Sequence, residues 1–387
     1  MDPLRNPYRP GAGAPPPLLA GRQKELEAIA TLLGRLQVGR GERSIVLTGL
    51  RGVGKTALLW SAEESAEELG WVAEGLEARS DLDFPAALAG RAWVILRQLE
   101  HKGAVREALS HLAAAIRRLR LRDPISGLEL SLEIDPGEPG AELEADLVAL
   151  FRALGEAARD ADTGVLLLLD ELQLAEPRDL EALCAAMHDL SKRELPVAAL
   201  IAGLPSLREQ LLSAKTYAER LFAYRELGPL PLDAAAAALA DPARSVDDGL
   251  EFGRDALDAL LTACEGYPYF IQVYGYAAWQ VASPPRVDVT DAAEALRLGR
   301  EELDADLYAG RWSRASERAK AYMHEMAAHG DGAVSSGAVA AAFGGHRASS
   351  AIRDRLIENG LIYSPARGQV AFTVPGFAGY IRRVEAG

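Results

Sequence analysis

Residues 49–56 read Gly-Leu-Arg-Gly-Val-Gly-Lys-Thr, with glycine, lysine and threonine at the spacing of a phosphate-binding loop. The apolar run 44–48 precedes this loop, and a helix-forming stretch begins at Ala57. In that context the loop N–H groups and the helix N-terminus face a bound polyphosphate. We therefore expect Lys55 to reach the β- and γ-phosphates and the Thr56 hydroxyl to bind Mg²⁺. The predicted nucleotide contacts in this segment are Gly49, Arg51, Gly52, Val53, Gly54, Lys55, Thr56 and Ala57.

A second candidate for the same chemistry is the acidic pair that ends the apolar run Gly164–Leu169. Asp170 at the carboxyl end of a buried strand can hold the magnesium shell opposite Thr56. The next carboxylate, Glu171, is placed to polarise a water molecule for attack on the γ-phosphate. Gln173 either helps to orient that water or faces solvent, and we favour the solvent-facing reading.

Composition limits the class of protein and its partners. The chain has 387 residues, which is enough for two or three domains with a substantial core. Its net charge of −14 argues against attraction of the whole surface to nucleic acid or to a membrane, but allows a local basic face. Cys184 and Cys264 are expected to be buried free thiols in a reducing compartment. No run of apolar residues approaches membrane-spanning length, so we expect a cytoplasmic protein without a membrane partner.

The elements around the loop predict an α/β fold. Further strands are expected at 71–77, 164–169 and 197–202, and helices alternate with them. Strands that alternate with helices form a parallel sheet covered on both faces. The remaining predicted elements are a helix at 22–37, a helical region at 84–118, a hairpin at 120–135, an acidic helix ending near 160 and a helix at 178–193.

Strand patterns nearly disappear between 229 and 310, where helices dominate. Asp233 is expected to cap the first of these helices, and Asp241-Pro242 to end it. From 312 onwards two helices, a third at 347–359 and two strand-like runs at 361–364 and 369–374 suggest a winged helix. The predicted divisions are an extended arm (1–18), a P-loop α/β core (19–228), a helical lid (229–311) and a winged-helix domain (312–387).

The segment 18–25 reads Leu-Leu-Ala-Gly-Arg-Gln-Lys-Glu and lies some 25 residues ahead of the loop. Here the chain resembles the STAND and replication-initiator branches of the AAA-type P-loop ATPases. The resemblance implies that ATP or ADP binds with Mg²⁺ between core and lid. It also implies that Gly21 and Arg22 help to form the adenine pocket, while Glu25 fixes the local helix.

Two further features carry the same resemblance. Gly266-Tyr267-Pro268 looks like the lid element in which the proline touches the nucleotide, so Pro268 is a candidate contact. Arg220 lies where the family often has an arginine that reaches the γ-phosphate of a neighbouring subunit, with Arg225 as a second candidate. Such a finger would make hydrolysis depend on homo-oligomer assembly. The alternative is that Arg220 is a surface residue paired with Glu219 or Glu226.

The chain also departs from the family pattern in two places. The segment Ala202-Gly203-Leu204-Pro205 offers no polar side chain where the fourth strand ends, and Ser206 lies further on. The lid also lacks the arginine that replication initiators usually show beside its glycine. Both gaps favour a slow, switch-like ATPase and the STAND branch.

The C-terminal region differs from the rest of the chain in charge. Residues 311–387 hold ten Arg or Lys and six Asp or Glu, or +4, which leaves −18 for the remainder (−14 minus +4). The helix at 347–359 carries side chains able to meet phosphates and base edges. His346 and Arg355 are among these side chains. In the alternative, arginines of this region pair with the ATPase core and hold it inactive. The candidate DNA contacts are Arg347, Ser349, Ser350, Arg353 and Arg367.

The sequence thus predicts a slowly hydrolysing, nucleotide-dependent switch of STAND type that controls a winged-helix module. Its catalytic residues would be Lys55, Asp170, Glu171 and Arg220, and its metal ligands Thr56 and Asp170. Two alternatives remain open at this stage. One is a replication-initiator or loader-like ATPase that binds duplex DNA, and the other is a non-catalytic scaffold that retains ADP for an unknown protein partner.

Overall fold

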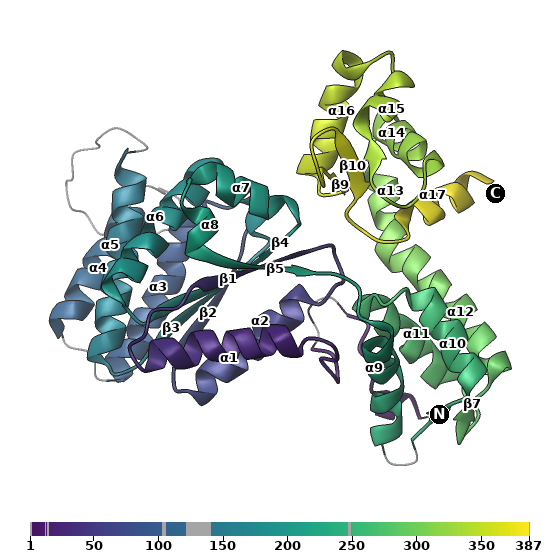
Figure 1. The fold of residues 1–387 in the computed structure, drawn as a ribbon, viewed down its shortest axis with the longest axis horizontal. Helices are drawn as coiled ribbons and strands as arrows, with labels where there is room; N and C mark the ends of the chain where they lie inside the picture. The colour runs from purple at the N-terminus through teal and green to yellow at the C-terminus, as the bar shows by residue number, and fades with distance from the viewer. Residues whose placement is uncertain are drawn as a thin grey trace.

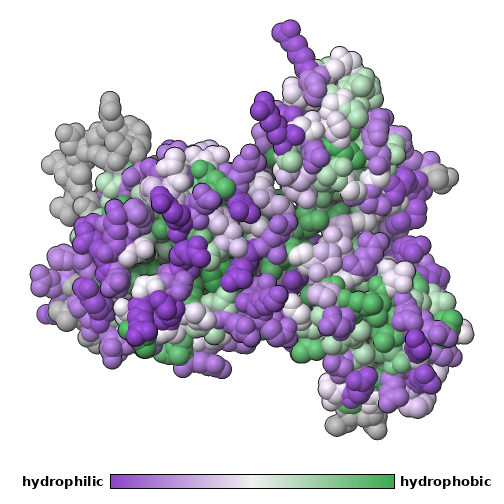
Figure 2. Space-filling view, viewed as in Figure 1, coloured by the Kyte–Doolittle hydropathy of each residue, from purple (hydrophilic) through white to green (hydrophobic). Residues whose placement is uncertain are grey.

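The computed structural model describes residues 2–386, except residues 12, 14, 103–105, 121–140 and 247–248. Figure 1 shows an α/β core beside two other parts, a helical lid and a C-terminal region of short helices and strands. Hydrophilic side chains cover most of the face drawn in Figure 2, and hydrophobic ones gather on the lid and where the parts meet. No helix of the described residues is long and apolar enough to cross a membrane.

The core is built on a parallel sheet with strand order β2-β3-β4-β1-β5. β1 and β4 are buried at every position. Uninterrupted apolar runs form such strands because both side-chain directions are covered. The predicted parallel sheet is confirmed, and the structure adds an edge strand, β5, that the sequence pattern did not indicate. The strands are β1 (Ser44–Gly49), β2 (Val72–Glu77), β3 (Val165–Asp170), β4 (Val197–Gly203) and β5 (Phe222–Leu227).

The two faces of the sheet belong to separate apolar clusters. Along β3, Leu166 and Leu168 join one cluster, whereas Leu167 and Leu169 join the other. This alternation follows from the two-residue period of a strand. The first cluster is covered by α1 (Gln23–Gln37) and α2 (Lys55–Glu68). The second face carries α3 (Phe84–His101), α4 (Arg106–Arg120), α5 (Ala141–Asp160), α6 (Pro177–Arg193), α7 (Ser206–Ala214) and α8 (Ala218–Leu221).

The helical region predicted at 84–118 consists of two helices, α3 and α4. Asp83 begins α3 by accepting a hydrogen bond from the Ala86 N–H at 3.0 Å. The acidic helix α5 packs with them, and its Leu147, Leu150 and Phe151 are buried in the core. This insertion therefore extends the hydrophobic core. The predicted hairpin at 120–135 lies outside the described residues, apart from Arg120, which ends α4.

The lid confirms the helical prediction but corrects its first helix. Asp233 lies inside the first turn of α9, which begins after Pro231. Pro242 does not end the helix, which continues to Ser245. A proline removes one helical N–H, and the Tyr8 hydroxyl donates to the nearby Leu239 carbonyl. The elements are α9 (Leu232–Ser245), β6 (Glu251–Phe252), α10 (Arg254–Cys264), α11 (Pro268–Val281), β7 (Arg286–Val287), α12 (Val289–Glu302), the π-helix η3 (Leu303–Ala309) and α13 (Gly310–Arg314).

The N-terminal arm packs on the lid and is anchored there. It begins with a 3₁₀ turn, η1 (Pro3–Arg5). The Trp279 indole N–H donates to the Asp2 carbonyl at 2.9 Å. Tyr8 is buried against Gly275, where a side chain would collide with its ring. These contacts bring the following residues of the arm towards the phosphate loop.

The C-terminal region contains three helices, a small antiparallel sheet of order β8-β10-β9 and a final helix that the sequence analysis missed. This final helix, α17, is fixed by Arg382 and Arg383, which pair with Asp331 at 3.1 Å and Asp304 at 2.5 Å. The elements are α14 (Glu317–Ala328), β8 (Val334–Ser335), α15 (Ser336–Ala341), α16 (His346–Glu358), β9 (Ile362–Tyr363), β10 (Gln369–Phe372) and α17 (Phe377–Ala386).

Lid and C-terminal region share one apolar cluster. Within it, Tyr308 of η3 stacks on Phe377 of α17 with 5.7 Å between ring centroids. The division predicted between residues 311 and 312 falls inside α13. The lid and the C-terminal region therefore pack against each other through one continuous apolar core.

Both cysteines are buried free thiols, as predicted. Burial raises the pKa of the Cys184 thiol to about 12. Burial also raises the pKa of Cys264. At neutral pH both are therefore protonated and behave as apolar core side chains.

Candidate nucleotide-binding site

The phosphate loop joins the carboxyl end of β1 to the first turn of α2. Gly52 and Gly54 have φ angles of 80° and 93°, a left-handed conformation that favours glycine. A side chain at Gly49 would meet the Leu227 carbonyl oxygen at 2.5 Å. Glycine is therefore required at these positions to shape the loop.

Lys55 lies at the mouth of this loop. Its Nζ donates to the carbonyls of Gly49 at 2.8 Å and Leu50 at 2.9 Å, and the residue is only 6% exposed. Burial lowers the pKa of the ammonium, while the nearby carboxylates of Asp170 and Glu171 oppose that shift. The ammonium is thus held at the loop by carbonyl oxygens that a more negative phosphate can replace.

Thr56, in the first turn of α2, contacts Asp170 at the carboxyl end of β3. The Thr56 hydroxyl donates to Asp170 Oδ2 at 2.9 Å. Hydroxyl and carboxylate oxygens are ligands that Mg²⁺ accepts, together with water and phosphate oxygens. No cluster of three or more His, Cys, Asp or Glu occurs among the described residues. The donor set therefore fits a magnesium ion that arrives with a nucleotide and does not form a cage for a resident metal.

Glu171 follows Asp170 in a left-handed conformation, with φ of 52°. Such angles are uncommon for residues other than glycine and occur often at functional sites. Its Oε2 accepts a hydrogen bond from Gln173 Nε2 at 2.6 Å and lies 3.4 Å from an Arg51 guanidinium nitrogen. The carboxylate is thus oriented from two sides.

The structure corrects the expectation that Gln173 faces solvent. This side chain is buried, and its Oε1 accepts the Leu204 N–H at 2.9 Å, in the segment after β4. Gln173 therefore links Glu171 to the strand end where the sequence showed no polar side chain. The short 3₁₀ turn η2 (Leu172–Leu174) produces this inward direction, and the sequence gives no periodicity that would reveal it.

The lid contacts the loop through the backbone. Tyr269 N–H donates to the Gly52 carbonyl at 3.1 Å, and Pro268 begins α11 directly before it. A cavity of about 390 Å³ opens between loop and lid. Besides loop residues 51, 52 and 54–57 and Glu171, its lining includes Tyr267, Pro268, Tyr269, Phe270, Gln272, Asp306, Leu307, Arg311 and Pro375, and Arg9, Gly11, Gly13 and Pro16 of the arm.

Gly21 and Arg22 are not among the residues that line this cavity, and their place in an adenine pocket stays a prediction. Arg22 is buried and donates to the carbonyls of Val53 at 2.9 Å and Gly228 at 2.7 Å. Burial lowers its pKa. Arg22 thus braces the loop against the start of the lid, and the arm supplies the cavity wall instead. The Gly- and Pro-rich arm carries no motif that would have predicted this.

The loop also contacts the C-terminal region. The Arg51 N–H donates to the Thr373 carbonyl at 3.2 Å, and Pro375 lines the cavity two residues later. Arg51 therefore touches Glu171 with its side chain and the C-terminal region with its backbone. The sequence predicted Arg51 only as a loop residue.

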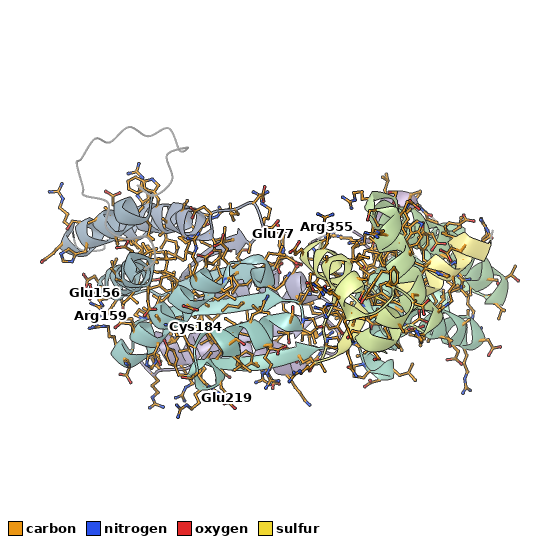
Figure 3. The ribbon with its side chains drawn as sticks, turned by 90° about the horizontal axis from the view of Figure 1, so that it is seen from above. Glu77, Glu156, Arg159, Cys184, Glu219 and Arg355 are labelled. Atoms are coloured by element: carbon orange, nitrogen blue, oxygen red, sulfur yellow. The ribbon has the colours of Figure 1, made fainter. Side chains whose placement is uncertain are left out.

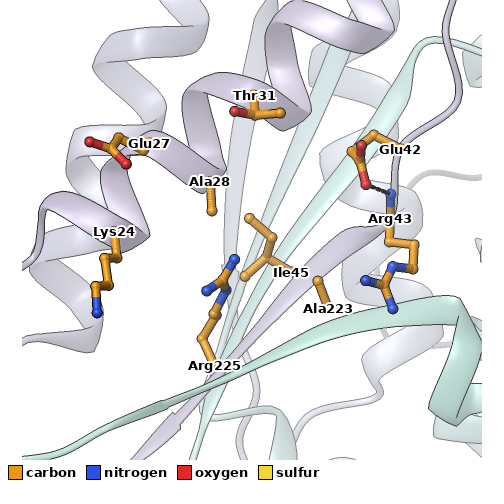
Figure 4. Close-up of a pocket in the computed structure, with 9 residues that line it drawn as sticks. All are labelled: Lys24, Glu27, Ala28, Thr31, Glu42, Arg43, Ile45, Ala223 and Arg225. Carbon is orange, nitrogen blue, oxygen red and sulfur yellow. Dashed lines mark hydrogen bonds between the residues drawn. The ribbon is translucent and has the colours of Figure 1, made fainter.

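The arginine-finger candidates lie away from this cavity. Arg220 is exposed on α8, which leads into the start of β5, whereas the phosphate loop lies at the opposite end of the sheet. It does not pair with Glu219 or Glu226. Arg225 lines a separate cavity of about 390 Å³ between α1 and the edge of the sheet (Figure 4). Neither arginine lines the cavity at the phosphate loop of its own chain.

The candidate DNA contacts on α16 divide between two environments. Arg347 is exposed, Ser350 is half-buried, and Arg353 pairs with Asp354 at 2.8 Å. Ser349 is 3% exposed, and its hydroxyl donates to the Gly345 carbonyl at 3.2 Å, so it does not face outward as expected. Arg367 is exposed between β9 and β10.

Comparisons with known proteins agree with the core. Residues 18–202 match the family model described as an AAA ATPase domain, and residues 305–381 match a domain of unknown function (DUF8462). No curated protein sequence matches the chain. The match and the geometry of the loop agree that residues 18–202 resemble an AAA ATPase domain, as expected from the sequence.

The fold is similar to solved structures over most of the chain. The Aeropyrum pernix Orc1 protein, solved in complex with DNA, matches with a TM-score of 0.50 and 18% identity, over 95% of this chain and 94% of that one. Cdc6p from Pyrobaculum aerophilum matches with a TM-score of 0.48 and 15% identity, over 99% and 98% of the two chains. A chain of Drosophila ORC bound to DNA gives 0.45 and 16%, over 98% and 90%. At 18% identity, the likeness to the Aeropyrum pernix protein concerns the fold alone.

Proposed function

We propose that the chain is a DNA-binding ATPase of the replication-initiator type, which was the alternative interpretation of its sequence. The observation that carries this proposal is the extent of the likeness to Orc1 in complex with DNA, which includes core, lid and C-terminal region in one arrangement. A shared ATPase core alone would not extend to 95% of the chain. ATP would bind between loop and lid, and the C-terminal region would contact duplex DNA.

The catalytic assignments follow from the geometry of the loop. Lys55 would exchange its two carbonyl acceptors for phosphate oxygens, a stronger charge-assisted pairing. Thr56 and Asp170 would hold Mg²⁺, which when bound supplies charge neutralisation at the phosphates. Glu171 would accept a proton from the attacking water. Gln173 and Arg51 already donate hydrogen bonds to this carboxylate, so it is less available to accept a proton, and we expect slow hydrolysis.

The C-terminal region has the element order of a winged helix, and we assign it as one. In this assignment α16 is the recognition helix and the β9–β10 turn is the wing. Exposed Arg347 and Arg367 then mark the DNA-facing side. Phosphate contacts of this kind give a salt-sensitive affinity that reads little sequence.

A STAND-type nucleotide switch is the second candidate, and a specific contact favours it. Arg51 of the loop is bonded to Thr373, and Gly52 to Tyr269 of the lid. A nucleotide that moved the loop would disturb both bonds. The docked C-terminal region would then be released for a partner. Arg220 would couple hydrolysis to a neighbouring subunit in either candidate.

Duplex binding followed by fluorescence anisotropy tests the first candidate. We expect salt-dependent binding that differs between ATP and ADP and weakens about threefold to tenfold in Arg347→Ala or Arg367→Ala. Arg254→Ala, a matched exposed arginine on the lid, should leave the affinity unchanged. Absence of duplex binding at low salt with either nucleotide would reject the initiator assignment. A nucleotide-dependent change in protease sensitivity of the C-terminal region, without DNA binding, would then favour the switch.

A further inference from the structure

A second cavity lies beside the nucleotide cavity and has an unusual lining. It encloses about 560 Å³ between the phosphate loop, α13, α14 and α16. Four of its eleven lining residues are arginines, Arg51, Arg311, Arg314 and Arg355, and none is acidic. These arginines come from the core, from the helix that leaves the lid and from the C-terminal region. The cavity therefore gathers cationic groups from all three parts of the chain.

The charges in this cavity are poorly neutralised. Arg311 and Arg314 donate to the main-chain carbonyls of Leu307 and Gly310 and pair with no carboxylate among the described residues. Arg355 likewise has no acidic partner within the described part of the chain. Only Arg51 has one, Glu171, and that carboxylate lines the nucleotide cavity instead.

The arginines also oppose one another. The pKa of Arg311 is lowered, first by burial and then by the neighbouring charges of Arg51 and Arg314. Holding like charges close together costs free energy unless an anion lies between them. Elsewhere on this surface arginines have carboxylate partners, as Arg297 has in Glu294 and Glu301. What distinguishes the cavity is that several such arginines lie close together around one hollow.

Arg355 shows that this set does not belong to the DNA-facing side of α16. In Figure 3 it lies on the side of the C-terminal region that is turned towards the core, across from Glu77 at the end of β2. No ion pair joins these two described residues. A duplex is read by elements that protrude into its grooves. A hollow between the phosphate loop and three helices has the opposite shape and suits a small molecule.

We propose that this cavity binds a small anion with two or more phosphate groups, and that the anion links α16 to the phosphate loop. Arginine suits this ligand because its planar donors pair with phosphate oxygens two at a time. Arg314 and Arg355 would supply the contacts farthest from the nucleotide. Arg51 and Arg311, which line both cavities, would connect them. This ligand is additional to the nucleotide held by Lys55 and Thr56.

Titration calorimetry with the full chain tests the proposal. The phosphate loop is first filled with saturating ADP and Mg²⁺, and pyrophosphate, tripolyphosphate and AMP are then titrated separately. We expect one further equivalent of pyrophosphate or tripolyphosphate to bind, with an affinity that falls as salt is raised. In Arg314→Gln/Arg355→Gln this affinity should fall at least about tenfold, while ADP affinity is retained.

A matched control is Arg318→Gln, an exposed arginine of α14 outside the cavity, which should bind like the parent. Thermal unfolding of each variant checks that it folds. Tighter binding of AMP, which has a single phosphate, than of pyrophosphate would overturn the assignment of a ligand with two or more phosphate groups. The proposal is overturned if no phosphate compound binds beyond ADP at low salt, or if the double variant binds as tightly as the parent. It is also overturned if the double variant binds duplex DNA more weakly but keeps the parent's affinity for pyrophosphate and tripolyphosphate.

Discussion

The phosphate loop and helix α16 differ in how far a short sequence fixes their side chains. In the loop, eight consecutive residues predict both the glycines with positive φ angles, Gly52 and Gly54, and the positions of Lys55 and Thr56. On α16, side chains that look equivalent in sequence separate, since Ser349 is buried and Arg355 faces the core. Local backbone geometry fixes the loop, whereas docking of the C-terminal region decides which side of the helix is free.

The largest expected effect comes from Lys55→Ala. Loss of this ammonium removes a charge-assisted contact to two phosphates and should weaken ATP binding about 100-fold, measured by calorimetry with Mg²⁺. Lys24→Ala, in the separate cavity beside α1, is the matched control and should bind like the parent. An unchanged ATP affinity in Lys55→Ala would show that the phosphate loop does not bind the nucleotide as its sequence predicts.

Glu171→Gln should separate binding from chemistry. The amide keeps the size of the side chain but cannot accept a proton, so hydrolysis should fall about 100-fold or more. ATP affinity should change little, because Glu171 is not expected to hold the phosphates. Single-turnover phosphate release measures the rate. Undiminished turnover would show that another group activates the water.

Gln173→Leu tests the link that the sequence did not reveal. The substitution leaves the buried Leu204 N–H without its acceptor, so the free energy of unfolding should fall by about 1–3 kcal/mol. Denaturant unfolding measures this change. The exposed Gln280→Leu on α11 serves as the control and should change stability by about 0.5 kcal/mol or less. Equal effects in both variants would contradict a structural role for Gln173.

The smallest effect is expected at Ser349. Because its hydroxyl bonds within its own helix, Ser349→Ala should leave duplex affinity within about twofold of the parent. Anisotropy beside Arg347→Ala measures the difference. If Ser349→Ala weakened binding more than Arg347→Ala did, α16 would present another face when bound, and the contrast with the loop would fail.

The lid shows where local rules mislead. Asp241-Pro242 is a common helix end, yet α9 continues to Ser245. Tyr8, far away in sequence, donates to the Leu239 carbonyl near that proline. Ala238 and Ala243 on either side of the proline are buried in the apolar core of the lid, so packing between distant segments outweighs the local signal. In the same way the extended arm forms a wall of the nucleotide cavity.

The sequence by itself determined the parallel sheet, the loop, the acidic pair after β3 and the buried state of both thiols. Each depends on residues that are adjacent or periodic, so short-range geometry and apolar burial suffice. Only the tertiary structure decided the position of Gln173, the bracing role of Arg22 and the contact of Arg51 with Thr373. It also gathered four arginines from distant segments into one cavity. These features depend on how whole elements pack together, and no local pattern records that.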